Sequence, residues 1–352
     1  MTQAPARAWV PAFVIAATSW GSSFLFISLA LRGLDPVQVG FGRVLIGAAV
    51  LWTMLLVTRH RPRLSRGDVA RIGVVALGLS TVPFVLIPLA QQHITSILAS
   101  LLNATTPLWT ALFVALLIPH ERASRAQVAG LVLGAAGIGV LLGAWNVDGI
   151  PLLGAALMLG ATACYGIGST MSRMLLTRVH EGPTALSAVQ IAISAVLLLP
   201  VALVAPAPDP GVLALSSEVL WGLLALGVLG TSFTYVMFWR VVKLAGATTA
   251  ASVTYVVPVV ATVLGILVLH EELRWHEPVG AVIVLAGVWL AQRTPRPRPS
   301  AEGPAQVAIP QGAAQDALPP AAPAVGAETS MAQPDEERAE QTREGDAGAA
   351  PA

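Results

Sequence analysis

The sequence has little charge, a single lysine and a single cysteine. Only 11% of its 352 residues are charged, whereas a soluble domain carries about 25%. Because 55% of the residues are hydrophobic and the mean hydropathy is +0.73, most of the chain is suited to lipid rather than water. The lone Cys164 excludes an intrachain disulfide and a multi-cysteine metal site. It lies in an apolar run, where a buried thiol is the simpler interpretation.

The motifs of several enzyme classes are also missing. The sequence contains no HExxH zinc motif and no GxxxxGK[ST] phosphate loop, so we expect no zinc hydrolase chemistry and no ATP hydrolysis by this chain. The histidines fall in expected loops and turns. We therefore expect no catalytic residues, no metal, no cofactor and no nucleic-acid partner.

Long apolar runs are abundant. The first, Trp9–Leu31, exceeds the roughly 7–15 residues of a signal-peptide core and can cross ~30 Å of hydrocarbon. With nine more runs joined by short turns, the sequence predicts an all-α integral membrane protein with ten transmembrane helices. The nine further predicted helices are Pro36–Thr58, Val69–Ala90, Ile94–Ile118, Ala126–Gly143, Ile150–Leu176, Thr184–Val204, Val219–Val241, Ala247–Leu269 and Glu277–Ala291.

Two parts of the chain repeat each other. The first five predicted helices match the last five. Because five is an odd number of membrane crossings, the second copy is inverted in the membrane relative to the first. We therefore predict two inverted five-helix repeats, residues 8–144 and 150–292, an arrangement that places the substrate of secondary transporters near mid-membrane. The matching pairs are His120-Glu121 with His270-Glu271, Gly130 with Gly280, Gly137 with Gly287, Pro107 with Pro258, Trp20 with Tyr165, Arg43 with Gln190, and Gly78 with Gly227.

The basic residues indicate an orientation. Arginine and lysine in short loops stay cytoplasmic. With both ends inside, the predicted inner segments hold fifteen of these residues and the outer segments two. We expect a multi-pass protein of the plasma or inner membrane with both termini cytoplasmic. Residues 293–352 have no aromatic residue and predict a disordered cytoplasmic tail.

The order of these features resembles paired EamA domains of the drug/metabolite transporter superfamily. The resemblance covers residues 8–292. No single motif is specific to the family, but the order of the motifs along the ten predicted helices is. It implies a secondary transporter that exports or exchanges small metabolites, often amino acids or drug-like compounds, in the lipid bilayer. A channel or a scaffold protein without alternating access is the alternative. The residues that carry the resemblance are Trp20-Gly21, Arg43, Pro107, Pro258, Glu121, Glu271, Gly130, Gly137, Gly280 and Gly287.

Polar side chains on the apolar runs suggest a substrate site. In the fourth run Ser96, Ser100, Asn103 and Pro107 share one helix face. They either line a central cavity or hydrogen-bond neighbouring helices. We predict that Pro107 and Pro258 are helix hinges. The predicted substrate-binding residues are Trp20, Arg43, Ser100, Asn103, Tyr165, Gln190, Thr254 and Tyr255.

Arg43 lies inside an apolar helix, where a charge is costly unless it pairs, snorkels or faces water. No carboxylate lies well inside any predicted helix to pair with it. Arg43 therefore is held by backbone carbonyls or reaches the outer surface, or it recognises an anionic group such as a carboxylate. His93 is the titratable candidate for proton coupling, and exchange or facilitated diffusion is an alternative to proton antiport.

Gly130 and Gly134 form a GxxxG motif in the fifth run. This motif lets two helices approach closely, and packing within the chain is favoured over a homodimer, which is possible but not required. Glu121 and Glu271 lie at helix ends, where we expect helix-cap or loop contacts.

Overall fold

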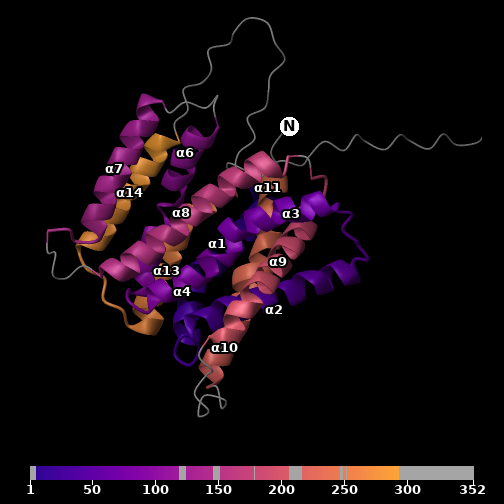
Figure 1. The fold of residues 1–352 in the computed structure, drawn as a ribbon. Coiled ribbons are helices and arrows are strands. Elements are labelled where there is room, and N and C mark those ends of the chain that lie inside the picture. The colour runs from indigo at the N-terminus through magenta and orange to yellow at the C-terminus, as the bar shows by residue number, and fades with distance from the viewer. Residues whose placement is uncertain are drawn as a thin grey trace, which may run out of the picture. The chain divides into compact units, whose positions relative to one another are not determined.

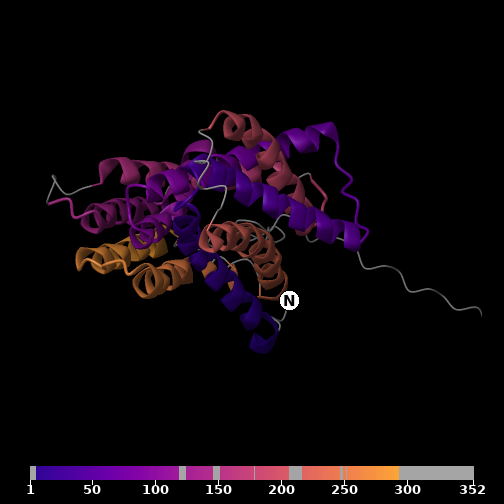
Figure 2. The same ribbon diagram turned by 90° about the horizontal axis from the view of Figure 1, so that it is seen from below.

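The computed structural model describes residues 5–118, 124–145, 151–177, 179–205, 216–245, 249–250 and 252–292. Every regular element in these ranges is helical (Figures 1 and 2). The predicted disordered tail, residues 293–352, lies outside the described residues, as does Glu121.

The helices follow the predicted runs closely, and some runs divide into consecutive segments. In the first half the elements are α1 (Ala6–Ala30), α2 (Pro36–Val57), α3 (Arg66–Ala76), the π-helix η1 (Leu77–Thr81), α4 (Pro83–Gln91), α5 (Ser96–Asn103), α6 (Thr106–Leu117) and α7 (Arg125–Leu141). In the second half they are α8 (Leu152–Leu175), α9 (Pro183–Val204), α10 (Ser217–Gly227), the π-helix η4 (Val228–Phe233), α11 (Thr234–Ala245), α13 (Val253–Leu269) and α14 (His276–Ala291).

Polar caps set several helix starts. Asp35 accepts a hydrogen bond from the backbone of Val37, with Pro36 in the first turn of α2. α3 begins at Arg66, earlier than the predicted Val69, because Ser65 forms a capping box with Asp68. Such side chains satisfy backbone N–H groups that have no partner within the helix.

Seven helical segments of the described chain are long and apolar enough to cross a membrane. Some of them join consecutive elements, such as α3, η1 and α4 in the segment Arg66–Gln91. The remaining apolar helices, α7, α13 and α14, have 17, 17 and 16 residues. The fold is therefore an all-helical membrane fold, and a count of ten spans stays a prediction.

Many of the most exposed side chains are apolar, and several of the most deeply buried ones are polar. Leu203 and Val204 at the end of α9 are 75% and 83% exposed, whereas Ser80, Ser194 and Thr231 have no exposed surface. Large exposed apolar areas are unusual on a soluble protein. In a bilayer they face lipid, and the buried hydroxyls hydrogen-bond between helices.

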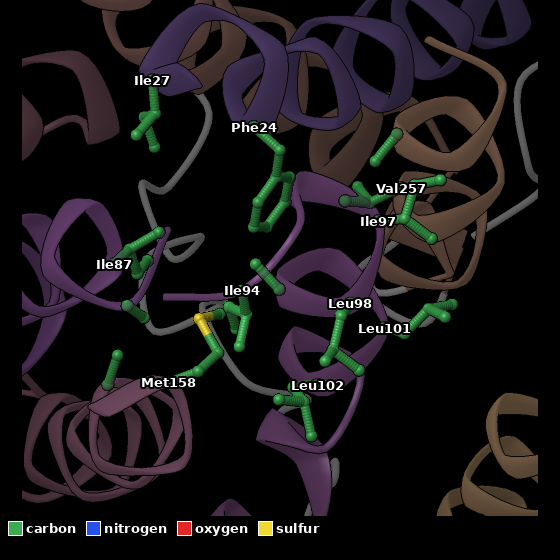
Figure 3. Close-up of a cluster of buried hydrophobic side chains, with 14 of the residues drawn as sticks. Phe24, Ile27, Ile87, Ile94, Ile97, Leu98, Leu101, Leu102, Met158 and Val257 are labelled. Atoms are coloured by element: carbon green, nitrogen blue, oxygen red, sulfur yellow. The ribbon is translucent and has the colours of Figure 1, made fainter. Parts of the chain in front are cut away.

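The largest hydrophobic cluster lies where helices of the two repeats meet (Figure 3). Phe24 of α1 and Val257 of α13 pack in the same cluster as Leu98 of α5 and Met158 of α8. α1 packs mainly against α10, α11 and α13, while α8 packs against α4 and α6. The first helix of each predicted repeat therefore has its main partners in the other repeat.

α7 and α14 lie side by side (Figure 1) and meet through glycines. A Cβ atom added at Gly287 would lie 2.6 Å from the backbone nitrogen of Gly134 and 2.8 Å from the carbonyl oxygen of Gly130. At Gly137 it would lie 2.7 Å from the backbone nitrogen of Val284. The GxxxG motif thus packs within the chain, as the sequence predicts.

Candidate functional site

The third and eighth predicted helices are each interrupted by a π-helix, η1 and η4. A π-turn contains one more residue than an α-turn, and such turns are frequent at functional sites. In η1 the backbone N–H of Val82 donates a hydrogen bond to the carbonyl of Leu77, five residues earlier in the chain. In η4 the side-chain hydroxyls also donate hydrogen bonds to carbonyls five residues earlier: Thr231 to Leu226, and Ser232 to Gly227.

Arg43 of α2 reaches η4. Its Nε donates to Thr231 Oγ1 at 2.9 Å and its Nη2 donates to the Gly230 carbonyl at 3.1 Å. The guanidinium carbon lies 3.8 Å from the centre of the Phe84 ring, a cation–π contact. Arg43 is only 6% exposed. One carbonyl, one hydroxyl and one aromatic ring thus hold the buried charge.

Gln190 of α9 makes the corresponding contact with η1. Its Nε2 donates to Ser80 Oγ at 3.2 Å. Ser194, one turn further along α9, lies 2.7 Å from Ser80 Oγ and accepts from Thr81 Oγ1 at 2.9 Å. This cluster is neutral where the Arg43 cluster is charged.

The two clusters are reciprocal. In each, the second helix of one repeat holds the π-helix in the third helix of the other repeat. Ser232 of η4 donates to the carbonyl of Gly47, one turn after Arg43, just as Thr81 donates to Ser194, one turn after Gln190. This arrangement agrees with the pairing of Arg43 with Gln190 in the sequence repeat.

Aromatic residues connect the two clusters. The Tyr235 hydroxyl hydrogen-bonds the Gln190 side chain, and Tyr165 and Tyr235 pack in the same hydrophobic cluster as Phe84, the ring that Arg43 contacts. Trp20 lies edge-on to Tyr235, with ring centres 6.3 Å apart, and 5.2 Å from the Phe238 ring centre. Trp20, Arg43, Tyr165 and Gln190 thus lie around Tyr235. They are four of the eight predicted substrate-binding residues.

Ser100 and Asn103 lie on α5, within the segment that ends at the break before Pro107. The Ser100 hydroxyl donates to the Ile97 carbonyl at 2.8 Å. Asn103 has a buried Oδ1 with no hydrogen-bond partner among the described residues. The chain turns at Ala104 and Thr105, and α6 begins at Thr106. The fourth helix is therefore discontinuous next to an unsatisfied amide oxygen.

The ninth helix differs from the fourth. α13 continues through Pro258, so a hinge role for this proline stays a prediction. Thr254 is exposed in the first turn of α13. Tyr255 donates to Gln292 Oε1 at 2.7 Å and packs in a different cluster, with Leu108 of α6 and residues of α14. The exposed His93 lies in the turn between α4 and α5.

Glu271 caps α5 from the α13–α14 connection. Its carboxylate accepts from the backbone N–H groups of Ser96 and Ile97 at 2.8 and 3.0 Å, and from the Ser96 hydroxyl at 2.9 Å. A negative charge is favourable at a helix N-terminus. This contact confirms the cap expected for Glu271, and it assigns Ser96 to the cap as well.

The EamA-like transporter family matches residues 7–143 and again 152–292 of the chain. Together these two matches cover most of the sequence. The chain belongs to the EamA-like transporter family.

The relatives of this EamA-like transporter are named as transporters. It is 28% identical to an uncharacterized transporter of Archaeoglobus fulgidus, over 77% of this chain and 92% of the relative. It is 30% identical to the probable terminal-alkyne amino-acid exporter of Streptantibioticus cattleyicolor, over 80% and 92%. The uncharacterized inner membrane transporter YedA of Escherichia coli K12 is 27% identical, over 70% and 78%. A solved crystal structure with 22% identity shares the fold, with a TM-score of 0.57 over 82% of this chain and 98% of that one.

Several residues of the candidate site in this EamA-like transporter are not predicted by the sequence. Phe84 and Thr231 contact Arg43, and Tyr235, Ser80 and Ser194 contact Gln190. One signal was available for two of them, Thr231 and Tyr235. The stretch Gly230–Tyr235, GTSFTY, is a dense polar run within an otherwise apolar helix.

Proposed function

We propose that this multi-pass membrane transporter exports small zwitterionic metabolites of the amino-acid class. The observation that carries the proposal is the buried Arg43. A guanidinium has five N–H donors, and among the described residues only its Nε and one Nη2 hydrogen have hydrogen-bond partners. The remaining donors suit a substrate carboxylate, since arginine binds carboxylates through parallel hydrogen bonds.

The surroundings of Arg43 suit the rest of such a substrate. The aromatic rings of Trp20, Tyr165 and Tyr235 offer apolar and cation-binding surface, and Gln190 adds a neutral polar group. The similarity to a probable terminal-alkyne amino-acid exporter supports the same substrate class. Ser100 and Asn103 extend the proposed site along α5, while Thr254 and Tyr255 of α13 stay predicted substrate-binding residues outside the Arg43 and Gln190 clusters.

The proposed mechanism is alternating access between two inverted five-helix repeats, residues 8–144 and 150–292. Its support is the reciprocal contact of Arg43 with η4 and of Gln190 with η1, because inverted repeats place matched elements around one mid-membrane site. The break before Pro107 supplies a hinge, and Pro258 is the matching candidate. We propose a functional monomer, with dimerisation not required.

Flux through proteoliposomes tests this function. Vesicles are loaded with radiolabelled neutral amino acids or with the amines that lack the carboxylate. We expect saturable efflux that favours the amino acids, and acceleration when the same amino acid is present on the opposite side. A channel would give flux that neither saturates nor accelerates. Repeating the assay with a pH gradient separates proton antiport, with His93 as the titrating candidate, from exchange or facilitated diffusion.

The orientation is proposed from the basic residues, fifteen on one predicted side and two on the other. With the N-terminus inside, the α2–α3 connection is cytoplasmic and the α4–α5 turn is external. A reporter active only outside the cytoplasm should therefore be silent when fused after Arg66 and active when fused after Gln92. Activity after Arg66 would overturn the orientation.

A further inference from the structure

A groove of about 480 Å³ opens beside the connection between α2 and α3, and the residues of the Arg43 and Gln190 clusters do not line it. Its floor is apolar. Trp52 and Leu56 of α2 are 38% and 73% exposed, and Val69 of α3 is 41% exposed. The groove is lined by Trp52, Leu55, Leu56, His60, Arg61, Pro62, Leu64, Val69 and Val189.

The groove lies at the ends of two helical segments that are long and apolar enough to span a membrane. α2 ends at Val57 and α3 begins at Arg66, and both belong to segments able to span the membrane. In a bilayer that these segments span, lipid acyl chains would lie beside the Trp52 side of the groove, and headgroups would lie beside the 58–65 connection. Tryptophan is enriched at this depth.

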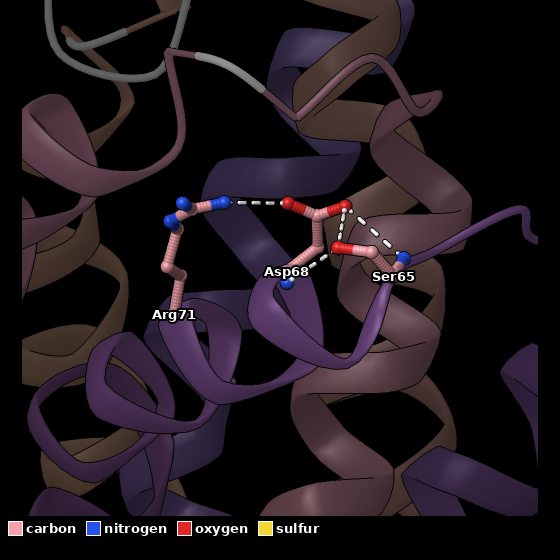
Figure 4. Close-up of polar contacts among 3 residues, drawn as sticks. All are labelled: Ser65, Asp68 and Arg71. Carbon is pink, nitrogen blue, oxygen red and sulfur yellow. Dashed lines mark hydrogen bonds and ion pairs between the residues drawn. The ribbon is translucent and has the colours of Figure 1, made fainter.

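The charge at the headgroup side of the groove is positive. The nearby carboxylates already have partners: Asp68 accepts from Ser65 and, at 2.8 Å, from Arg71 (Figure 4). Glu181 pairs with His60 at 3.1 Å and accepts from the backbone of Arg63. Arg61 is exposed and has no hydrogen-bond partner among the described residues.

An apolar groove with an unneutralised arginine at its headgroup end matches the chemistry of an anionic phospholipid. We propose that this groove binds one such lipid, with an acyl chain along Trp52, Leu56 and Val69 and the phosphate at Arg61. Val189 of α9 also lines the groove, so the bound lipid contacts α2 and α3 of the first repeat and α9 of the second. This site is separate from the proposed substrate site.

Quenching of Trp52 fluorescence by brominated lipid tests the site. The full-length transporter is placed in liposomes of phosphatidylglycerol and phosphatidylcholine, with the brominated acyl chain carried by one or the other at equal mole fraction. The signal of wild type minus that of Trp52→Phe isolates Trp52. We expect quenching to show about fivefold enrichment of phosphatidylglycerol, the ratio that one basic residue near the headgroups supplies.

Arg61→Gln should abolish this enrichment, whereas Arg66→Gln should preserve it. Arg66 is the matched control because it is an exposed arginine of the same region that does not line the groove. Equal quenching by the two lipids, or an equal loss of the enrichment in both variants, would overturn the proposal. The basic residues of this region would then attract anionic lipids only in general, without a site in the groove. Millimolar inorganic phosphate should leave the enrichment unchanged; if it removes the enrichment, the site binds free anions and the lipid assignment is wrong.

Discussion

Replacing Gly287 with alanine is expected to destabilise the folded transporter by about 1–3 kcal/mol, the usual cost of overpacking a tight interior. The new Cβ would meet three backbone atoms of α7 at 2.6–2.8 Å. Backbone cannot move aside as a flexible side chain can, so α7 and α14 must separate along their contact. The measurement is the fraction of purified protein that stays monodisperse after heating.

Gly139→Ala is the matched control, since Gly139 lies on α7 but not at the crossing. A Cβ there would have its nearest neighbour, the Cβ of Ala144, at 4.0 Å. Alanine is favoured over glycine in a helix by roughly 0.8–1.0 kcal/mol, so this variant should match or exceed the wild type. If Gly287→Ala is as stable as Gly139→Ala, the close packing of α7 on α14 is refuted.

Replacing Arg43 with glutamine is expected to weaken transport of amino acids strongly while sparing the amines that lack the carboxylate. Losing one partner of a buried charged pair costs roughly 2–5 kcal/mol. We therefore expect an increase of about 30-fold or more in the half-saturating concentration of amino acids. The same proteoliposome assay measures both substrates.

Arg43→Lys keeps the charge and should keep part of the preference for amino acids. It loses the fixed geometry of the guanidinium, including the hydrogen bond from Nε to Thr231. If Arg43→Gln weakens the transport of amino acids and of amines equally, or fails to insert into the membrane, Arg43 only joins α2 to η4. The carboxylate proposal would then be wrong.

The apolar runs and the internal repeat predict most of the helices, because hydrocarbon requires long apolar segments whatever their neighbours. The glycines of α7 likewise predict a close helix contact. Their partner is harder to predict, since a GxxxG face fits a helix of the same chain as well as a helix of a second copy. The structure resolves this choice by placing Gly287 of α14 against Gly130 and Gly134.

The partners of Arg43 and Gln190 could not be predicted in the same way. A π-turn shifts the following side chains relative to an α-helix, and apolar periodicity does not indicate where the extra residue is inserted. Ser80 and Thr231 therefore have no sequence signal that directs them toward the opposite repeat. Glu271 was correctly predicted as a cap, but its target at Ser96 is distant in the sequence and depends on the three-dimensional arrangement of the helices.

The glycine contact between α7 and α14 has a consequence for the order of biosynthesis. α7 ends at Leu141, whereas its partner α14 ends at Ala291 and is the last described helix of the chain. At roughly 5–20 residues per second, the ribosome needs on the order of ten seconds to make the intervening chain. During that interval the glycine face of α7 is in the bilayer without its native partner, open to insertase proteins and to other nascent helices. Folding of this region is therefore completed only after translation has passed α14.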